Sequence, residues 1–497
     1  MNRTIFACIL LGAFFLICSL PQYAQNIAWP QFRGINCSGI ADENQDPPIS
    51  FGKDQNMIWN TNLSTGQSSP CIWQDNIFIT GYEEEEKLLK MYCIDRISGA
   101  IQWQKEISVK EFEKVHAVSS PANATPSTDG ERVYFYFGSY GLLCYDYKGE
   151  QQWVFPMPVP ESWWGMGTSP VVSGDLVILN CFGHFNDPCL LALNKYDGNV
   201  VWKHSLQIRD NFKENSYSTP IIHDDQVIIY RSEDVAAYHI KTGERIWRFI
   251  TTGVTNAVCT PVVGDDILYA AVFSSIGNPE VRAQFPGFIE FAAEYDENRD
   301  WLLDKKEIVD FKFSMYPEEG EISDPLSLAS YFGRWDQNRD NFIDSTEWRI
   351  MAEFMVSLYE KQGLKAIKLG GYGDVSYDNY LWGHPEHVSH IPSPIYYNNR
   401  IYMIRSGGII SCLDAESGDL LYRERLGAPG AYFSSLIAAN GRIYSASRNG
   451  IVTVFEAGDM LNILAQNDLD DKISATPAIV DNKLYIRTAG SLYAFGE

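Results

Sequence analysis

Residues 393–422 read SPIYYNNRIYMIRSGGIISCLDAESGDLLY and contain one complete copy of a pattern that recurs along the chain. A Ser-Pro pair opens the pattern, an Asn-Asn turn follows, and residues 400–403 form a β-branched and aromatic run that is typical of a strand. A second strand ends near Asp414, and Gly418 then precedes the aromatic Tyr422 by four residues. Glycine supplies the positive φ that a tight hairpin turn needs. This stretch therefore predicts a small unit of short antiparallel strands.

Copies of the opening pair occur eight times, and most successive copies lie 41 to 56 residues apart, the size of a four-stranded propeller blade. The openers are Ser69-Pro70, Thr125-Pro126, Ser169-Pro170, Thr219-Pro220, Thr260-Pro261, Ser393-Pro394, the degenerate Ser434-Ser435-Leu436, and Thr476-Pro477. The turn glycine and its aromatic recur as Gly99 and Trp103, Gly149 and Trp153, Gly198 and Trp202, and Gly243 and Trp247. Alternation along a strand places each aromatic ring where it can pack against the neighbouring blade.

The two ends of the chain complement each other. The last copy stops at Glu497 after about three strands, and residues 57–63 resemble the missing Trp-bearing outer strand. A borrowed strand would close the ring and remove an exposed sheet edge, which favours a propeller over an open solenoid. The sequence thus predicts an all-β, eight-bladed β-propeller over residues 26–497.

The repeat, with Leu-Asp-Ala-Glu-Ser-Gly-Asp-Leu-Leu-Tyr at 413–422, resembles the tryptophan-docking repeat of quinoprotein-type propellers. That group includes the PQQ-dependent alcohol dehydrogenases and the outer-membrane assembly factor BamB. The segments at 29–34 (WPQFRG) and 371–375 (GYGDV) resemble a bacterial set of exported PQQ-like repeat proteins. The resemblance covers nearly all of the chain after its first residues. It implies a fold of PQQ-like repeats more than a function, because such propellers carry many functions.

One interval between openers, from 261 to 394, leaves roughly 90 residues beyond an ordinary repeat. Within it, residues 296–307 and 336–347 both place Asp, Asn, Asp, Asp and Glu at positions 1, 3, 5, 9 and 12 of a twelve-residue loop. Those are the oxygen-ligand positions of an EF-hand, and position 7 adds a backbone carbonyl. The predicted calcium ligands are Asp296, Asn298, Asp300, Leu302, Asp304, Glu307, Asp336, Asn338, Asp340, Phe342, Asp344 and Glu347.

Segments suited to helices flank the loops, at 288–295, 305–311, 327–335 and 347–360. The sequence therefore predicts an α-helical EF-hand pair over residues 280–365, inserted in the fifth blade. Both loops lack the glycine expected at position 6, where Trp301 and Asn341 stand, and Trp adopts a left-handed conformation at a cost of about 1 kcal/mol or more. The first loop is therefore the weaker site. The alternative is an acidic helical hairpin that binds nothing.

The first 25 residues have the pattern of a secretion signal. Arg3 is followed by an apolar run at 5–16, which is short for a membrane span, and by the exit segment 21–25. Ile17 before Cys18 does not suit a lipoprotein signal, so we predict a cleaved signal and a periplasmic or secreted protein without a lipid anchor. No other stretch is apolar enough over sufficient length to cross a bilayer.

The formal net charge of −24 disfavours nucleic-acid binding and anionic membrane surfaces, and it suits divalent metals, cationic ligands or uncharged sugars. Cys93, Cys144 and Cys412 occupy the same position in three repeats, which predicts buried strand residues. Cys181 and Cys189 are close enough in sequence to form a disulfide, and their pairing is left open.

Two further groups of residues have alternative interpretations. His384, His387 and His390 could converge on a metal, but Pro385 and the adjacent strand pattern favour an ordinary blade-to-blade loop. Residues 163–167 (WWGMG), together with His116 and Asn123, should lie near a mouth of the central channel. Aromatic rings there could stack on a sugar or a peptide, or they could plug the channel.

These features favour an extracytoplasmic, calcium-binding propeller that acts as a non-catalytic binding or scaffold protein with a protein or carbohydrate partner. The alternative is a quinoprotein-type oxidoreductase, or another enzyme that uses the channel. The resembling dehydrogenases typically place a vicinal Cys-Cys disulfide against the quinone, and this chain has no adjacent cysteines and no haem-attachment motif. PQQ is therefore not expected as a cofactor, and no catalytic residue is nominated.

Overall fold

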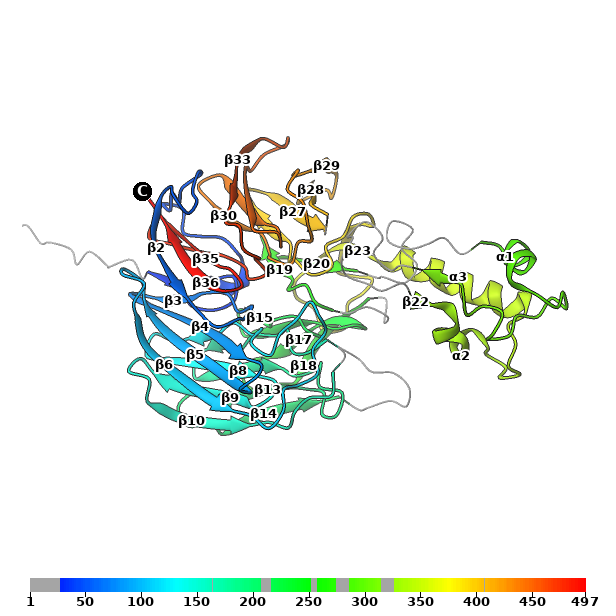
Figure 1. Cartoon of the computed structure of the whole chain (residues 1–497), viewed down its shortest axis with the longest axis horizontal. Helices are drawn as coiled ribbons and strands as arrows, with labels where there is room; N and C mark the ends of the chain where they lie inside the picture. The colour runs from blue at the N-terminus through cyan, green and yellow to red at the C-terminus, as the bar shows by residue number, and fades with distance from the viewer. Residues whose placement is uncertain are drawn as a thin grey trace, which may run out of the picture.

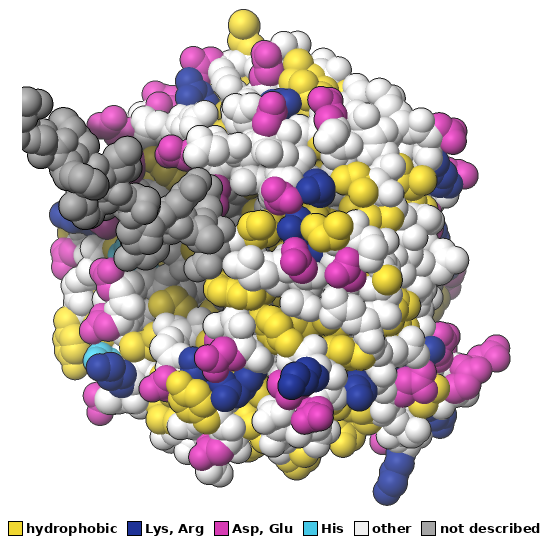
Figure 2. Space-filling view, turned by 90° about the vertical axis from the view of Figure 1, so that its left-hand side faces the viewer, with side chains coloured by type: hydrophobic (Ala, Val, Ile, Leu, Met, Phe, Trp, Pro, Cys, Tyr) yellow, Lys and Arg dark blue, Asp and Glu magenta, His cyan; other side chains and the backbone are white. Residues whose placement is uncertain are grey.

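The computed structural model describes residues 27–162, 164–206, 216–251, 257–273, 286–313, 326–405 and 407–497. Among these residues, eight sheets form the blades of a propeller, as the eight openers predict (Figure 1). Each blade has four antiparallel strands, and two of the sheets carry one additional short strand. Figure 2 shows the rounded outline of the face turned away from the helices, where acidic and basic side chains are interspersed.

The blades follow each other in chain order, and the strands of each blade are named from the innermost to the outermost. Blade 1 contains β3 (Cys71–Trp73), β4 (Asn76–Glu83), β5 (Leu88–Asp95) and β6 (Ile101–Ser108); blade 2 contains β7 (Ser127–Thr128), β8 (Arg132–Phe137), β9 (Gly141–Asp146) and β10 (Gln151–Pro156). Blade 3 contains β11 (Val171–Ser173), β12 (Leu176–Asn180), β13 (Cys189–Asn194) and β14 (Val200–Ser205); blade 4 contains β15 (Ile221–His223), β16 (Gln226–Tyr230), β17 (Asp234–His239) and β18 (Arg245–Ile250).

The second half continues in the same order. Blade 5 contains β19 (Val262–Gly264), β20 (Ile267–Val272), β23 (Gly363–Lys368) and β25 (Tyr380–His384); blade 6 contains β26 (Ile395–Tyr397), β27 (Arg400–Arg405), β28 (Ile409–Asp414) and β29 (Leu420–Arg425). Blade 7 contains β30 (Ile437–Ala439), β31 (Arg442–Ala446), β32 (Ile451–Glu456) and β33 (Ile463–Asp468); blade 8 contains β34 (Ala478–Val480), β35 (Lys483–Arg487), β36 (Ser491–Phe495) and β2 (Met57–Asn62).

The Ser and Thr residues of the openers form a closed ring of hydrogen bonds around the propeller axis. The backbone N–H of each opener donates to the side-chain hydroxyl of the opener in the next blade, over 2.9 to 3.2 Å. The ring closes where the Thr476 N–H donates to the hydroxyl of Ser69. Its members are Ser69, Thr125, Ser169, Thr219, Thr260, Ser393, Ser435 and Thr476. The small opener residue is thus an inter-blade link, and the degenerate copy supplies Ser435.

The turn glycines and the outer-strand tryptophans connect the blades at the rim, as predicted. The indole N–H of Trp202 in blade 3 donates to the Ile240 carbonyl of blade 4 over 2.8 Å, and its ring covers Gly243. Trp59, Trp103 and Trp153 repeat the arrangement over Gly99, Gly149 and Gly198. Trp382 of β25 likewise covers Gly418, a contact that the sequence pattern did not predict.

Substituting Gly243 with alanine tests this contact. A Cβ there would lie 2.4 Å from the Trp202 ring, and φ is 70°, so the variant should lose about 2 kcal/mol in the free energy of unfolding. Gly441 is a matched control, because its φ is 69° but a Cβ would meet open space. Chemical denaturation should therefore show a clearly smaller loss for Gly441→Ala, and equal losses would show that the Trp202 contact contributes nothing.

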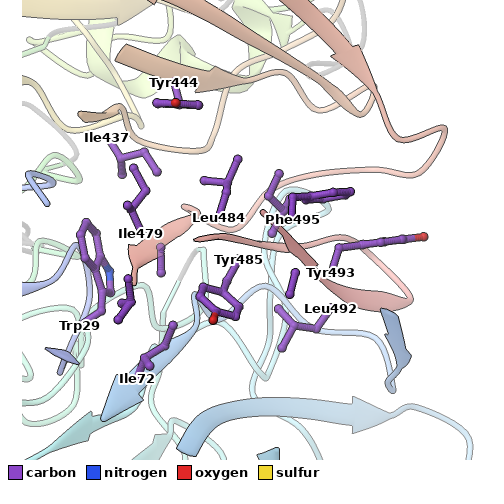
Figure 3. Packing of buried hydrophobic residues seen from close by; sticks show 14 of the residues in the cluster. Trp29, Ile72, Ile437, Tyr444, Ile479, Leu484, Tyr485, Leu492, Tyr493 and Phe495 are labelled. Atoms are coloured by element: carbon purple, nitrogen blue, oxygen red, sulfur yellow. The ribbon is translucent and has the colours of Figure 1, made fainter. Parts of the chain in front are cut away.

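The borrowed strand closes the ring. β2 pairs antiparallel with β36, with Trp59 opposite Ala494 and Asn62 opposite Ser491. Leu63 continues the segment, since its N–H donates to the Gly490 carbonyl over 2.9 Å. The prediction for residues 57–63 is therefore confirmed. Figure 3 shows the apolar packing around this blade, where Leu484, Tyr485, Leu492 and Phe495 lie with Ile72, Trp29 and Ile437 from its neighbours.

Residues 29–41, which precede β2, lie against the inner strands of several blades, which the sequence did not predict. β1 (Ala28–Trp29) pairs with β3 of blade 1, and the short 3-10 helix η1 (Ile35–Cys37) follows. Pro30 accepts a hydrogen bond from the Thr128 N–H of blade 2, and Gly39 accepts one from the Ala438 N–H of blade 7, both over 2.9 Å. We call residues 29–41 the channel segment.

The helices lie between β20 and β23 of blade 5 and stand away from the blades (Figure 1). α1 (Phe288–Tyr295) and α3 (Ser345–Lys361) match two of the predicted helices. The segment at 327–335 divides into η2 (Leu328–Tyr331) and α2 (Phe332–Trp335), and β21 (Lys312–Phe313) pairs with β22 (Leu326–Ser327). The predicted helix at 305–311 is wrong, because residues 305–310 form turns.

Candidate metal-binding loops and the propeller channel

The two acidic loops lie side by side and are joined through their backbones. The Leu303 N–H donates to the Ile343 carbonyl over 3.0 Å, and the Ile343 N–H donates to the Leu303 carbonyl over 2.9 Å. Both side chains are fully buried with Phe291, Trp335 and Trp348 in a small apolar core. The described helical region therefore has its own core, which fixes the position of one loop relative to the other.

Each loop folds around its first aspartate. Asp296 accepts hydrogen bonds from the N–H groups of Arg299, at 2.7 Å, and Trp301, at 2.8 Å. Asp336 accepts from the N–H groups of Asp340 and Asn341, at positions 5 and 6 of its loop, over 3.1 and 3.0 Å. The residue at position 6 is left-handed in both loops, with φ of 62° at Trp301 and 71° at Asn341. Trp301 thus adopts the strained conformation that the sequence predicted, with half of its side chain exposed.

The terminal glutamates draw the ends of each loop together. Glu347 is 5% exposed and accepts backbone hydrogen bonds from Gln337, Asn338 and Asp344 at 2.8 to 3.2 Å. Glu307 accepts from Glu297 at 3.2 Å and from Asp304 at 2.8 Å. The remaining predicted residues form short turns. The side-chain oxygen of Asn298 accepts from the backbone N–H of Asp300, and the Asp300 carboxylate accepts from the N–H of Leu302. In the second loop, Asn338, Asp340 and Phe342 repeat this pattern.

These carboxylates therefore bond mainly to amides of their own loop. Among the residues that the structure describes, no three His, Cys, Asp or Glu side chains form a group that could hold a metal ion. Asp304 and Asp344 also accept from the N–H groups two and three residues later, at 2.6 to 3.0 Å. The structure brings all twelve predicted positions into two equivalent loops, and it leaves their oxygens directed at backbone donors.

The histidine-rich segment links blade 5 to blade 6, as the blade-to-blade interpretation predicted. His384 lies 2.9 Å from a guanidinium nitrogen of Arg423, and His387 lies 3.3 Å from one of Arg405. His390 stacks on Phe273 with ring centroids 4.2 Å apart. Burial lowers the pKa of His387 and His390 to about 4, so both rings are neutral at pH 7. In the described part of the chain, the three rings do not form a group that could hold a metal ion.

The predicted channel-mouth residues of blades 2 and 3 lie together. The His116 ring contacts Trp164 with centroids 4.3 Å apart, and the Asn123 amide donates to the Met166 carbonyl over 3.4 Å. Trp164 is half-buried, so its ring packs against the protein. Trp163 lies outside the described residues.

Glu113, which no sequence pattern marks, is buried beside these residues. Its carboxylate accepts from the Ser139 hydroxyl at 3.0 Å and from the Met166 N–H at 3.3 Å. Burial raises the pKa of Glu113 to about 7, against the lowering effect of these two hydrogen bonds. Nearby, the Tyr136 hydroxyl lies 2.7 Å from Nε2 of His184, whose pKa burial lowers to about 4. The sequence did not predict these sites, because Glu113 and His184 lie in connections between strands.

The cysteines behave as small apolar residues. Cys93, Cys144 and Cys412 are fully buried in their strands, as predicted. Cys181 and Cys189 face each other, since the Cys181 N–H donates to the Cys189 carbonyl over 2.8 Å, and both are free thiols in the structure.

Comparison with known proteins places the chain in a structural class. A family model described as outer membrane protein assembly factor BamB matches residues 93–283. BamB from Moraxella catarrhalis is 12% identical, covers 89% of this chain and 99% of its own, and superposes with a TM-score of 0.51. The chain therefore has the fold of an eight-bladed β-propeller, and residues 93–283 carry the match to the BamB family model.

Quinohemoprotein alcohol dehydrogenases have the same fold. ADHIIG from Pseudomonas putida HK5 is 11% identical, with a TM-score of 0.52 over 95% of this chain and 80% of the dehydrogenase. The enzyme from Comamonas testosteroni is 9% identical, with a TM-score of 0.53 over 95% and 81%. At these identities the likeness shows the fold alone. No curated protein sequence matches the chain. None of the described helices is long and apolar enough to cross a membrane.

Proposed function

We propose that the protein is an extracytoplasmic, calcium-binding propeller that acts as a non-catalytic binding or scaffold protein. The observation that carries the non-catalytic role is the channel segment. It bonds to the inner strands of blades 1, 2 and 7, and so fills the space where an enzyme of this fold would need room for a cofactor. A filled channel leaves the two faces and the rim as the surfaces that meet a partner. A protein or carbohydrate partner suits them better than nucleic acid, because the net charge is −24.

The calcium proposal rests on the donor set of the two loops. Each loop offers five oxygen-bearing side chains and one backbone carbonyl at the spacing of an EF-hand, and calcium is a hard cation that takes six to eight oxygen ligands. The backbones already turn around Asp296 and Asp336. Calcium would replace the amide hydrogen bonds that now satisfy Glu307 and Glu347. We assign this EF-hand pair to residues 280–365, as a stabilising or docking module inserted in the fifth blade.

Export is part of the same proposal. We infer that residues 1–25, which lie outside the described residues, are a cleaved signal and that the mature protein is periplasmic or secreted, without a lipid anchor. Extracellular calcium is plentiful enough to fill sites with dissociation constants of roughly 0.1 to 1 mM. Intact mass spectrometry of the exported protein would contradict this by showing a diacylglycerol on Cys18.

Calorimetric titration with calcium tests the metal sites. The wild type should release or absorb heat on binding, and Glu347→Gln should weaken the second site at least about tenfold, because one of two carboxylate oxygens is replaced by an amide nitrogen. Glu307→Gln should have a smaller effect, because Trp301 already strains that loop. Glu353→Gln is the control, since Glu353 lies on α3 and is exposed with Arg349 as its partner. Absence of calcium heat in the wild type would refute the sites.

The alternative is a quinoprotein-type oxidoreductase, or another enzyme that uses the channel. This alternative is supported by the fold that the chain shares with quinohemoprotein alcohol dehydrogenases. Adding PQQ with calcium and recording the quinone absorbance of the protein after gel filtration separates the two proposals. We expect no quinone to elute with the protein. One bound quinone per protein molecule would overturn the non-catalytic proposal. The calcium proposal would still be tested separately by the calorimetric titration.

A further inference from the structure

Arg33 of the channel segment is fully buried at the centre of the propeller. Its Nη2 donates to the Pro394 carbonyl of blade 6 over 2.8 Å and to the Ser38 carbonyl over 3.2 Å. Pro394 directly follows Ser393, a member of the opener ring. The guanidinium group, which comes from the WPQFRG motif at 29–34, therefore lies beside that ring.

Two nitrogen donors of this guanidinium have no partner among the described residues. Nε and Nη1 of Arg33 are both buried and make no hydrogen bond in the described part of the chain. The great majority of buried polar groups in proteins are satisfied by protein, ordered water or a bound ion. An arginine can donate five hydrogen bonds and accept none, so its unused N–H groups call for an acceptor.

The positive charge also lacks a carboxylate among the described residues. Burial lowers the pKa of Arg33 to about 10, and the nearest groups that raise it are the thiols of Cys37 and Cys259. The guanidinium is therefore charged at pH 7, and both thiols are neutral there because burial raises the pKa of each to about 12. By contrast, the buried Arg231 pairs with Asp234 at 2.6 Å. A buried cation without a counter-ion is costly, because an isolated charge is poorly solvated in a protein interior.

The chain is shaped to keep the group in place. A Cβ at Gly39 would lie 2.9 Å from Nη2 and 3.2 Å from Nε, and Gly39 has a φ of 77°. Glycine at this position thus lets the backbone turn behind the guanidinium and leaves it room. At Gly34, the last residue of the motif, a Cβ would likewise come close to a side chain, at 2.8 Å from the Trp29 ring. These contacts hold the guanidinium beside the opener ring.

We propose that Arg33 binds a small monovalent anion inside the central channel, and that this anion helps to hold the channel segment in the propeller. The anion would accept charge-assisted hydrogen bonds from Nε and Nη1, and its negative charge would balance the positive charge of the guanidinium. Two sources have this chemistry: a halide taken from the solvent, and the carboxylate of a small organic acid. The site is independent of the calcium loops, which lie in the helical insertion.

Thermal unfolding at constant ionic strength tests the proposal. The protein starts in the sodium salt of a bulky sulfonate buffer, and this salt is replaced stepwise by sodium bromide or by sodium acetate. Wild-type protein should show a saturable rise in melting temperature of about 3 °C or more with the anion that binds. Arg33→Gln should lose this response. Arg400→Gln, which removes a surface arginine paired with Asp459, should keep it. A response to bromide alone identifies a halide site, and a response to acetate alone identifies a carboxylate site.

Crystals of the wild type grown with bromide give a second readout that needs no variant. Anomalous scattering should show bromide within hydrogen-bond distance of Nε or Nη1 of Arg33, and a site that prefers carboxylates should instead show acetate there in matched crystals. The proposal is overturned if only water occupies this position in both crystals. It is also overturned if Arg33→Gln responds to the anions as the wild type does.

Discussion

A Trp59→Ala variant should lose about 3 to 5 kcal/mol in the free energy of unfolding, as buried aromatic residues do when truncated. Trp59 is 8% exposed, its ring covers Gly99 of blade 1, and its indole N–H donates to the Arg96 carbonyl over 3.0 Å. The residue lies on β2, which completes blade 8 by pairing with β36. The substitution therefore weakens both the junction between blades 8 and 1 and the packing of the closing strand.

Ile58→Ala provides the control on the same strand, because Ile58 is 43% exposed and its truncation removes little buried surface. Denaturation with urea should show a loss below about 1 kcal/mol for Ile58→Ala. Equal losses for the two variants would mean that strand pairing alone, without the docking of Trp59 on Gly99, stabilises the closure.

Glu113→Gln should make the protein more stable above pH 7, by up to about 3 kcal/mol. The folded protein keeps the Glu113 proton up to a pKa of about 7, whereas the ordinary pKa of a glutamate in the unfolded chain is 4.5. The free energy of unfolding should therefore fall as the pH rises from about 4.5 to about 7, and it should stay low above that range. Glutamine stays neutral, and its Oε1 can accept from the Met166 N–H while its Nε2 donates to the Ser139 hydroxyl, so it removes this penalty.

The measurement is a series of denaturation curves between pH 5 and 8 for the wild type, Glu113→Gln and Glu131→Gln. Glu131 lies between β7 and β8 with an exposed side chain, so its substitution should leave the pH dependence unchanged. If the wild type and Glu113→Gln lose stability in parallel over this range, the buried carboxyl group is not the cause.

The propeller was predictable because its blades repeat. Each blade carries its local signals at the same positions, so that Thr219, Gly243 and Trp247 are recognisable from their spacing alone. The closing strand was predictable for the same reason, since Trp59 repeats the tryptophan of the other outer strands. Trp382 was missed, because the connection from β23 to β25 is lengthened by a segment that includes residues 373–374, and Asp378 rather than a glycine stands four residues before the tryptophan.

The channel segment could not be predicted, because its partners are set by the assembled ring. β1 has two residues, η1 has three, and the contacts of Arg33 and Gly39 are with blades 6 and 7, far along the chain. Local periodicity carries no information about such contacts. The same holds for β24 (Gly373–Asp374), which adds parallel to β18 of blade 4. Glu113 was missed because its pKa depends on burial by neighbouring loops.

The conformation of the two acidic loops could be predicted only in part. Their spacing predicted two equivalent turns and the left-handed Trp301, and both are present. The direction of the side-chain oxygens is a different matter, since it depends on the balance between backbone donors and a cation. The turn in place of a helix at 305–310 shows the limit of reading helices from apolar spacing in a short acidic segment.

The order in which the chain is synthesised gives the closing strand a kinetic consequence. Residues 29–62 are synthesised early, yet their partners include Ala438, Asn467 and Ser491, which are synthesised near the end. Contacts between residues about 400 positions apart form slowly, because the intervening chain must first become compact. β2 must therefore wait for its strand partner β36 while the first seven blades fold. A chain that is released before residue 491 would keep an exposed sheet edge at blade 8, which would make it a target for aggregation or proteolysis.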